Sequence, residues 1–245
     1  MSNGREPQVI DTFLGLTDTL VHDFDALDML TMLSERCVEL LDVDAAGVIL
    51  TDGQGGLSVA AASTERTRLL EVFAVAIDAG PCVDCVRSGR PVSSEDLTAP
   101  GAGDRWPRYA SQATDAGFRS THALPMRLRD EVIGVLTLLH TDPHILVDDD
   151  VRLGQALADA ATIGLLHERA VRYAETVQEQ LQGALNSRVI IEQAKGVVAG
   201  QSELGPEEAF GRLRTHARRH GLRLTDLARA VVERTVDVAS LRPGP

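Results

Sequence analysis

The chain has 245 residues, of which 44% are hydrophobic and only 3% aromatic, and its formal net charge is −12. That length and apolar content allow one large domain or two small ones with real cores, and no apolar run approaches the ~20 residues of a membrane-spanning helix. The first residues, MSNGREPQVIDTF, lack the basic head and apolar middle of a secretory signal, and the cysteines number three. We therefore expect a cytoplasmic protein without a disulfide framework.

The negative charge is divided unevenly along the chain. Residues 187–245 contain ten basic and seven acidic side chains, which gives +3, whereas residues 1–186 contain 14 basic and 29 acidic ones, which gives −15. Such an asymmetry suggests two modules with different partners. Only the C-terminal module is expected to meet phosphate.

The N-terminal half begins with two expected helices and a hairpin. Apolar residues recur at helical steps over 7–22 and again over 26–41, where Asp25 can cap the second helix. Residues 45–52 are expected to form a strand, and a GQGG turn leads to its hairpin partner at 57–63.

A helical crossing and a second hairpin follow. Helices are expected over 64–75, 80–91 and 108–116, with a short strand at 92–96. Residues 120–127 and 131–140 form the second expected hairpin, and VIGVLTLLH is almost continuously apolar, as a central strand would be. The order predicts an α+β fold, an antiparallel sheet with flanking helices. Over 26–166 it resembles a GAF sensor domain, which implies a pocket for a small ligand whose identity is unknown.

A long helix is expected to connect the two modules. Asp148, Asp149 and Asp150 place negative charge at its start, where it is favourable, and no proline follows before Pro206. We expect its first half to pack on the sheet and its exposed second half, around residues 170–191, to form a coiled coil with a second copy of the chain. The two core positions of the expected heptad repeat are Ile163, Ala170, Val177, Ala184 and Ile191, and His167, Ala174, Leu181 and Arg188.

The C-terminal module contains an apolar helix and then an arginine-rich one. In VIIEQAKGVVAG, residues 189–200, apolar residues recur at helical spacing around Lys195 and Gly196. Glycine inside a helix costs about 1 kcal/mol relative to alanine, so Gly196 makes sense if a partner approaches the backbone closely. In FGRLRTHARRHGLRL, residues 210–224, no acidic residue occurs, and a basic face on a small apolar bundle indicates a polyanion partner.

These two segments, SRVIIEQAKGVVAGQ and PEEAFGRLRTHARRHGLRLTDLARAVVE, resemble the ANTAR domain, a three-helix RNA-binding module of bacterial transcription antiterminators. The resemblance covers roughly residues 181–237 and departs from the family at Ala217, often serine, and Gly221, often asparagine. It implies binding to paired RNA stem-loops, one for each ANTAR unit of a dimer. The RNA contacts expected are Ala194, Lys195, Gly196, Arg212, Arg214, His216, Arg218, Arg219 and Arg223.

The expected organisation is an N-terminal helix (1–25), a GAF-like sensor domain (26–166), a helical coiled-coil linker (167–186) and an ANTAR-like three-helix domain (187–245). The expected function is a signal-responsive RNA-binding regulator of gene expression that acts as a transcription antiterminator. The alternative is a small-molecule or redox sensor whose basic tail contacts a protein or DNA. Against DNA, the tail has a single aromatic residue, Phe210, and no helix-turn-helix consensus.

The sequence gives no sign of catalysis or of a metal site. It lacks a G-x-S-x-G elbow, a Walker A sequence and a G-x-G-x-x-G turn, so we expect no enzyme. Cys82 and Cys85 have the spacing of a redox pair, although simple structural cysteines are the commoner outcome. No His-x-x-x-His pair with a carboxylate partner is expected. His216 and His220 have that spacing, but the surrounding arginines favour contact with a polyanion.

Overall fold

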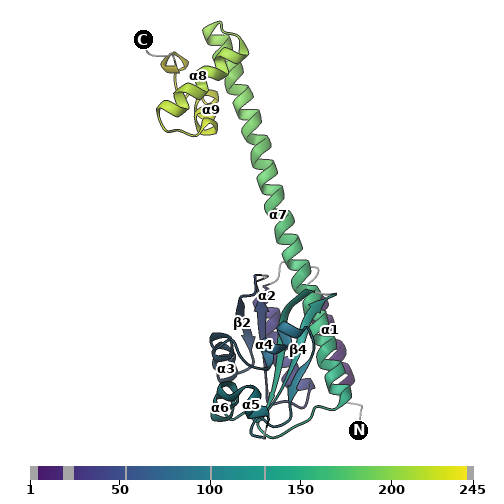
Figure 1. The fold of residues 1–245 in the computed structure, drawn as a ribbon. Helices are drawn as coiled ribbons and strands as arrows, with labels where there is room; N and C mark the ends of the chain where they lie inside the picture. The colour runs from purple at the N-terminus through teal and green to yellow at the C-terminus, as the bar shows by residue number, and fades with distance from the viewer. Residues whose placement is uncertain (1–4, 19–24, 53, 100, 130, 242–245) are drawn as a thin grey trace. The chain divides into compact units, whose positions relative to one another are not determined.

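The structure is a computed structural model that describes residues 5–18, 25–52, 54–99, 101–129 and 131–241 (Figure 1). The chain divides into two compact units, residues 1–170 and residues 171–245, and each is described by itself. The long helix α7, Asp148–Ser202, contributes residues to both units.

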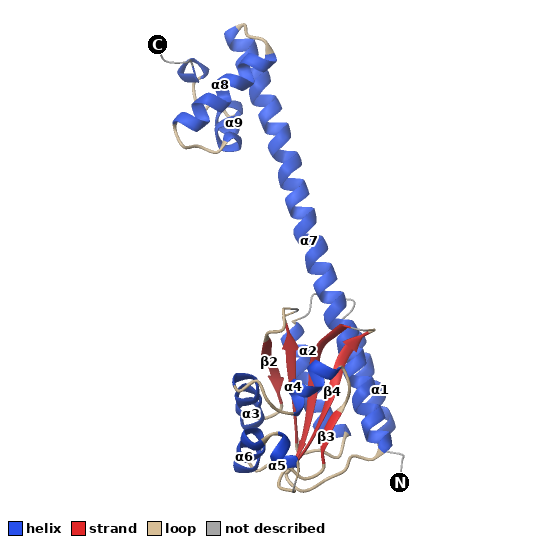
Figure 2. Cartoon of the chain, viewed as in Figure 1, coloured by secondary structure: helices blue, strands red, loops and turns tan. Residues whose placement is uncertain are grey.

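The first unit is built on a five-stranded antiparallel sheet with the strand order β2-β1-β5-β4-β3 (Figure 2). Both expected hairpins are confirmed, and the apolar strand β5 lies at the centre, paired with β1 on one side and β4 on the other. The strands are β1 (Ala45–Thr51), β2 (Leu57–Ala62), β3 (Val92–Ser94), β4 (Ser120–Leu128) and β5 (Glu131–His140).

Both faces of this sheet are buried, which explains why its central strands are apolar on both sides. Side chains of a strand alternate between faces, and in β1 Ala46 and Val48 belong to one core while Ala45 and Ile49 belong to the other. The first core is covered by α1 (Arg5–Asp18), α2 (Ala26–Leu40) and the first half of α7. The second is covered by α3 (Glu65–Ala76), α4 (Pro81–Ser88) and α6 (Pro107–Asp115). A short helix, α5 (Ala102–Arg105), precedes α6.

Local capping signals fix where the helices begin. The Asp25 carboxylate accepts a hydrogen bond from the Leu27 N–H at 2.8 Å, as its position in the sequence predicted. Thr64 caps α3 in the same way, through the Thr67 N–H at 3.2 Å. Helix α1 ends at Asp18, and the rest of the helix expected over 7–22 lies outside the described residues.

Helix α7 begins with the three aspartates expected at its start. Asp150 is engaged there, because its carboxylate forms an ion pair with Arg5 at 2.6 Å. Its first half packs on the sheet as expected, through the buried residues Leu157, Ala158 and Ala161. None of the described helices has the length and apolar character needed to cross a bilayer.

The second unit is a small helical bundle around one apolar core. The C-terminal end of α7 packs with α8 (Pro206–Arg219), α9 (Leu224–Val232) and a short 3-10 helix, η1 (Val238–Leu241). Leu213, Leu227 and Val231 are almost fully buried in this core. Gly221 follows α8 in the left-handed region, with φ of +63°, where glycine and asparagine are both suited to end a helix.

Candidate nucleic-acid interface and interior of the first unit

The exposed basic residues of the second unit belong mainly to α8. Leu213 and Ala217 face the core, so the helical period turns Arg214, Arg218 and Arg219 outward, and all three are exposed. Within the described part of the chain none of these three arginines makes an ion pair. They therefore offer free charge, and two of them lie in the last turn, where the helix dipole favours a cation.

The other two expected arginine contacts differ from each other. Arg212 is half-buried, and its guanidinium lies 3.4 Å from the Glu208 carboxylate one turn earlier on the same helix. Arg223 is exposed in the connection that leads into α9. Arg212 is thus partly neutralised within the protein, whereas Arg223 is not in contact with an acid in any described ion pair.

His216 and His220 stack on each other, with ring centroids 4.1 Å apart. Burial lowers the pKa of His216, and the neighbouring His220 and Arg219 lower it further, while the backbone of Ser240 works in the opposite direction. A neutral, stacked imidazole is a packing surface more than a charge. His216 therefore adds a flat ring beside the arginines and not a cation.

Lys195 and Gly196 lie on the surface of α7 where it joins the bundle. The Lys195 side chain is only 20% exposed, and its Nζ lies 2.5 Å from a carboxylate oxygen of Glu192, so the lysine is less open than its position suggested. Gly196 is exposed, and a Cβ built there would meet no atom of another residue within 4 Å beyond its own helix backbone. The space beside Gly196 is open for a partner to approach the backbone.

Ala194 does not belong to this surface, which corrects the expectation that it contacts RNA. Its side chain is completely buried in the core of the bundle, together with Val198 of the same helix face. The helical period explains the difference: a residue four positions before Val198 must share its face, and that face packs on α8 and α9.

The interior of the first unit contains a buried carboxylate that the sequence did not reveal. Glu71 of α3 is fully buried within the second core. Burial raises its pKa to about 7, although Thr137 and Cys82 both favour the charged form. Gly47 on β1 lets α3 approach closely, because a Cβ there would lie 3.2 Å from Thr67 and 3.4 Å from the Glu71 side chain.

Further polar groups surround Glu71. The hydroxyl groups of Tyr109, Thr121 and Thr137 and both carboxylate oxygens of Glu71 are buried. Among the described residues, none of these atoms makes a hydrogen bond of good distance and angle. Burial raises the pKa of the Tyr109 hydroxyl well above its ordinary value, and the nearby Glu71 and Cys82 raise it further. This group of five side chains, Glu71, Cys82, Tyr109, Thr121 and Thr137, is the buried polar cluster. It offers hydrogen-bonding groups on the face of the sheet covered by α3, α4 and α6.

The two cysteines of the CxxC sequence lie in the core and are free thiols. Burial raises the pKa of Cys85 to about 12 and raises that of Cys82 well above its ordinary value. Since the thiolate is the reactive form, these environments oppose the redox pair considered from the sequence.

A group of side chains that could hold a metal ion was also missed. His140 and His144 have the His-x-x-x-His spacing, and Asp42 and Asp44 are their carboxylate partners, so the expectation that no such pair exists was wrong. The two aspartates are about a hundred residues away in the sequence. The pairing of β1 with β5 brings them to His140, at the end of β5.

Comparisons with known proteins agree with this division. A family model described as a GAF domain matches residues 25–165, and one described as an ANTAR domain matches residues 179–232. The comparison with curated proteins gave no match.

Solved structures resemble the chain in fold alone. The GAF domain of a phosphoenolpyruvate-protein phosphotransferase from Acinetobacter is 15% identical, with a TM-score of 0.52, over 70% of this chain and 98% of its own. The corresponding domain from Coxiella burnetii is 16% identical, with a TM-score of 0.52, over 68% and 98%. A free methionine-R-sulfoxide reductase from Neisseria meningitidis is 15% identical, with a TM-score of 0.51, over 70% and 96%. The GAF model matches more than half of the length of this chain. The chain therefore belongs to the GAF domain family, and it continues into an ANTAR domain.

Proposed function

We propose that this chain is a signal-responsive regulator that binds paired stem-loops in nascent RNA and acts as a transcription antiterminator. Its domains pair a sensor with an RNA-binding module. The observation that supports RNA binding most is the exposed, unpaired set of arginines on α8, in a bundle whose core is complete without them. Splayed loop bases are more accessible to such a surface than the deep groove of duplex RNA.

The proposed RNA surface is smaller than the set expected from the sequence. Arg214, Arg218, Arg219 and Arg223 are its phosphate contacts, and Lys195 joins them by exchanging the Glu192 carboxylate for phosphate. Gly196 provides the open backbone against which a base can lie. Arg212 and His216 lie at the edge of this surface and are not among its phosphate contacts. Ala194 packs in the core and helps to position the helix.

The proposed functional unit is a homodimer paired through the second half of α7. In the single chain this part of the helix exposes large apolar side chains, among them Leu181 (61%), Leu185 (59%) and Val189 (56%). Shallow apolar grooves run along it, lined by residues such as Tyr173, Val177 and Leu181. A second copy presents the same stripe and so complements it. Ile191, expected in the same seam, instead packs against the bundle core.

Lys195→Ala is expected to weaken binding to an RNA of two tandem stem-loops while leaving the fold intact. Loss of one phosphate contact should lower the slope of log affinity against log salt by up to about 0.7–0.9, and by less to the extent that Glu192 already neutralises the charge of Lys195. The measurement is a binding titration at several salt concentrations. The matched control is Arg36→Ala, a partly exposed, ion-paired cation of the GAF domain, which should change neither quantity. An unchanged affinity and slope for Lys195→Ala would remove this residue from the RNA surface.

The loss of RNA binding on replacing each arginine should depend on whether that arginine is ion-paired within the protein. Arg214→Ala and Arg218→Ala are each expected to lower the salt slope by about 0.7–0.9, because each removes a free cation. Arg212→Ala should have a smaller effect, since Glu208 already neutralises part of its charge. The same titrations compare the three variants. Equal decreases of the salt slope for all three variants would show that the ion pair with Glu208 does not reduce the contribution of Arg212 to RNA binding.

A further inference from the structure

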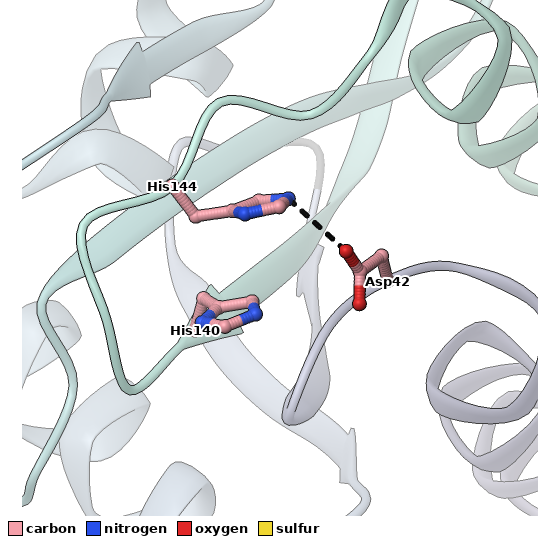
Figure 3. A group of neighbouring side chains, drawn as sticks. All are labelled: Asp42, His140 and His144. Carbon is pink, nitrogen blue, oxygen red and sulfur yellow. Dashed lines mark ion pairs between the residues drawn. The ribbon is translucent and has the colours of Figure 1, made fainter.

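Two histidines and an aspartate meet at the edge of the GAF domain that precedes α7. Asp42 lies between α2 and β1, His140 ends β5, and His144 lies between β5 and α7. Each offers one ligand atom, and these three atoms all lie within 4.8 Å of one another. The imidazole rings stack with centroids 4.4 Å apart, and His144 Nε2 is 3.8 Å from the Asp42 carboxylate (Figure 3).

The sheet register explains why these residues meet. Ala45 pairs with Leu139, and the Asp44 N–H donates to the Leu139 carbonyl at 2.9 Å. Residues just before β1 and just after β5 must therefore lie side by side. His144 is brought back to the same place by a short connection in which its own N–H donates to the Glu95 carbonyl at 3.0 Å.

Asp44 contacts His140 of this cluster through its carboxylate. Its Oδ2 lies 3.2 Å from His140 Nδ1 and accepts hydrogen bonds from the Thr141 N–H and hydroxyl, both at 2.7 Å. The Asp142 N–H also lies 3.1 Å from Nδ1, so Asp44 and Asp142 compete for that nitrogen. A cation on Nε2 would favour Nδ1–H donating to Asp44, the arrangement in which a carboxylate orients a metal-bound histidine.

A third histidine adds an unpartnered polar group next to the cluster. His122 is 8% exposed, and its Nε2 has no hydrogen-bond partner among the described residues. His122 and His140 lie on neighbouring strands, and since Ser120 pairs with His140, the two histidines are on the same face of the sheet. The ring of His122 lies against the backbone of His144.

We propose that Asp42, His140 and His144 bind a transition-metal dication, with Zn²⁺ as the occupant. Two imidazoles and a carboxylate are ligands that suit zinc and that Mg²⁺ and Ca²⁺ do not select. Ligand atoms around tetrahedral zinc lie roughly 3.3 Å apart, so the side chains must close by about 1.5 Å at most. The Asp42 side chain is 75% exposed and free to make that movement. The fourth position is left to water.

The ion would join three segments that the sheet and the hydrogen bonds from Thr141 to Asp44 already bring together. One of them is the connection that leads directly into α7, and His144 lies four residues before that helix begins. Zinc would hold this connection against β1 and β5, and so fix how α7 leaves the sheet. The proposal stands apart from RNA binding, because its site lies entirely within the GAF domain.

Calorimetric titration of the metal-stripped full-length protein with Zn²⁺ tests the site. We expect one ion per chain. Asp42→Asn should weaken zinc binding at least ~tenfold, and so should Asp44→Asn, which acts through the orientation of His140. Co²⁺ in place of Zn²⁺ should give visible absorption bands in the parent protein that Asp42→Asn weakens. Asp42 is exposed, so melting of the stripped variant should match that of the stripped parent.

The matched control is the double variant His216→Ala/His220→Ala, which removes the other His-x-x-x-His pair of the chain. It should bind zinc as the parent does. The proposal is overturned if the parent binds no zinc, or if this control loses zinc while Asp42→Asn retains it. Equal binding by the parent, Asp42→Asn and the control would place zinc elsewhere and overturn it as well.

Discussion

Glu71→Gln is expected to remove a pH dependence of stability worth about 3 kcal/mol, because burial raises the pKa of this carboxyl from 4.5 to about 7. Between these two values the folded chain keeps a proton that the unfolded chain has released. The stability that Glu71 contributes is therefore fully present below pH 4.5 and is lost as the pH rises through 7. Glutamine has a similar shape and no charge to bury. The free energy of unfolding of the variant should therefore rise relative to that of the parent as the pH increases over that interval.

The measurement is the free energy of unfolding of parent and variant at several pH values between 4.5 and 8. Taking the difference between the two proteins isolates Glu71 from other groups such as His122, whose pKa is lowered by burial and which acts in the opposite direction. Glu65→Gln on the same helix is the control, since a hydrogen bond from Arg68 lowers the pKa of Glu65 at the surface. If parent and Glu71→Gln keep parallel profiles, Glu71 is not a buried carboxyl that titrates near neutrality.

Leu181→Asp is expected to separate the proposed dimer. The substitution places a charge in the apolar seam, where an unpaired charge costs about 3–5 kcal/mol, equivalent to more than a hundredfold in the dimer dissociation constant. In the single chain Leu181 is 61% exposed, so the fold of each domain should not change. Sedimentation over a range of protein concentrations measures the effect.

The control for this experiment introduces the same charge on a neighbouring face of the helix. Gln180 is exposed and does not line the apolar grooves, so Gln180→Asp should leave the dimer intact. A parent protein that sediments as a monomer, or a Leu181→Asp variant as dimeric as the parent, would contradict pairing through α7. Dimerisation should also raise affinity for paired stem-loops, because the second contact becomes intramolecular.

The sequence by itself determined the order of elements and the division of functions. Both hairpins, the cap at Asp25 and the left-handed Gly221 follow from local turn and capping chemistry, which acts over a few residues. Arg214, Arg218 and Arg219 are exposed as predicted, because the period of an amphipathic helix separates them from Leu213 and Ala217. These features depend on neighbours in the chain, and the sequence displays neighbours directly.

Only the tertiary structure decided which side chains of the other segments are buried and which residues meet. Ala194 and Lys195 are adjacent in the sequence, yet the docking of α8 and α9 buries the alanine and leaves the lysine beside Glu192. Glu71 looks like any surface acid of a helix until that helix packs on the sheet at Gly47. Asp42 reaches His140 through the register of β1 on β5, and the connection after β5 brings His144 to the same place. Contacts between distant segments are set by the packing of complete elements, and no local pattern in the sequence encodes that packing.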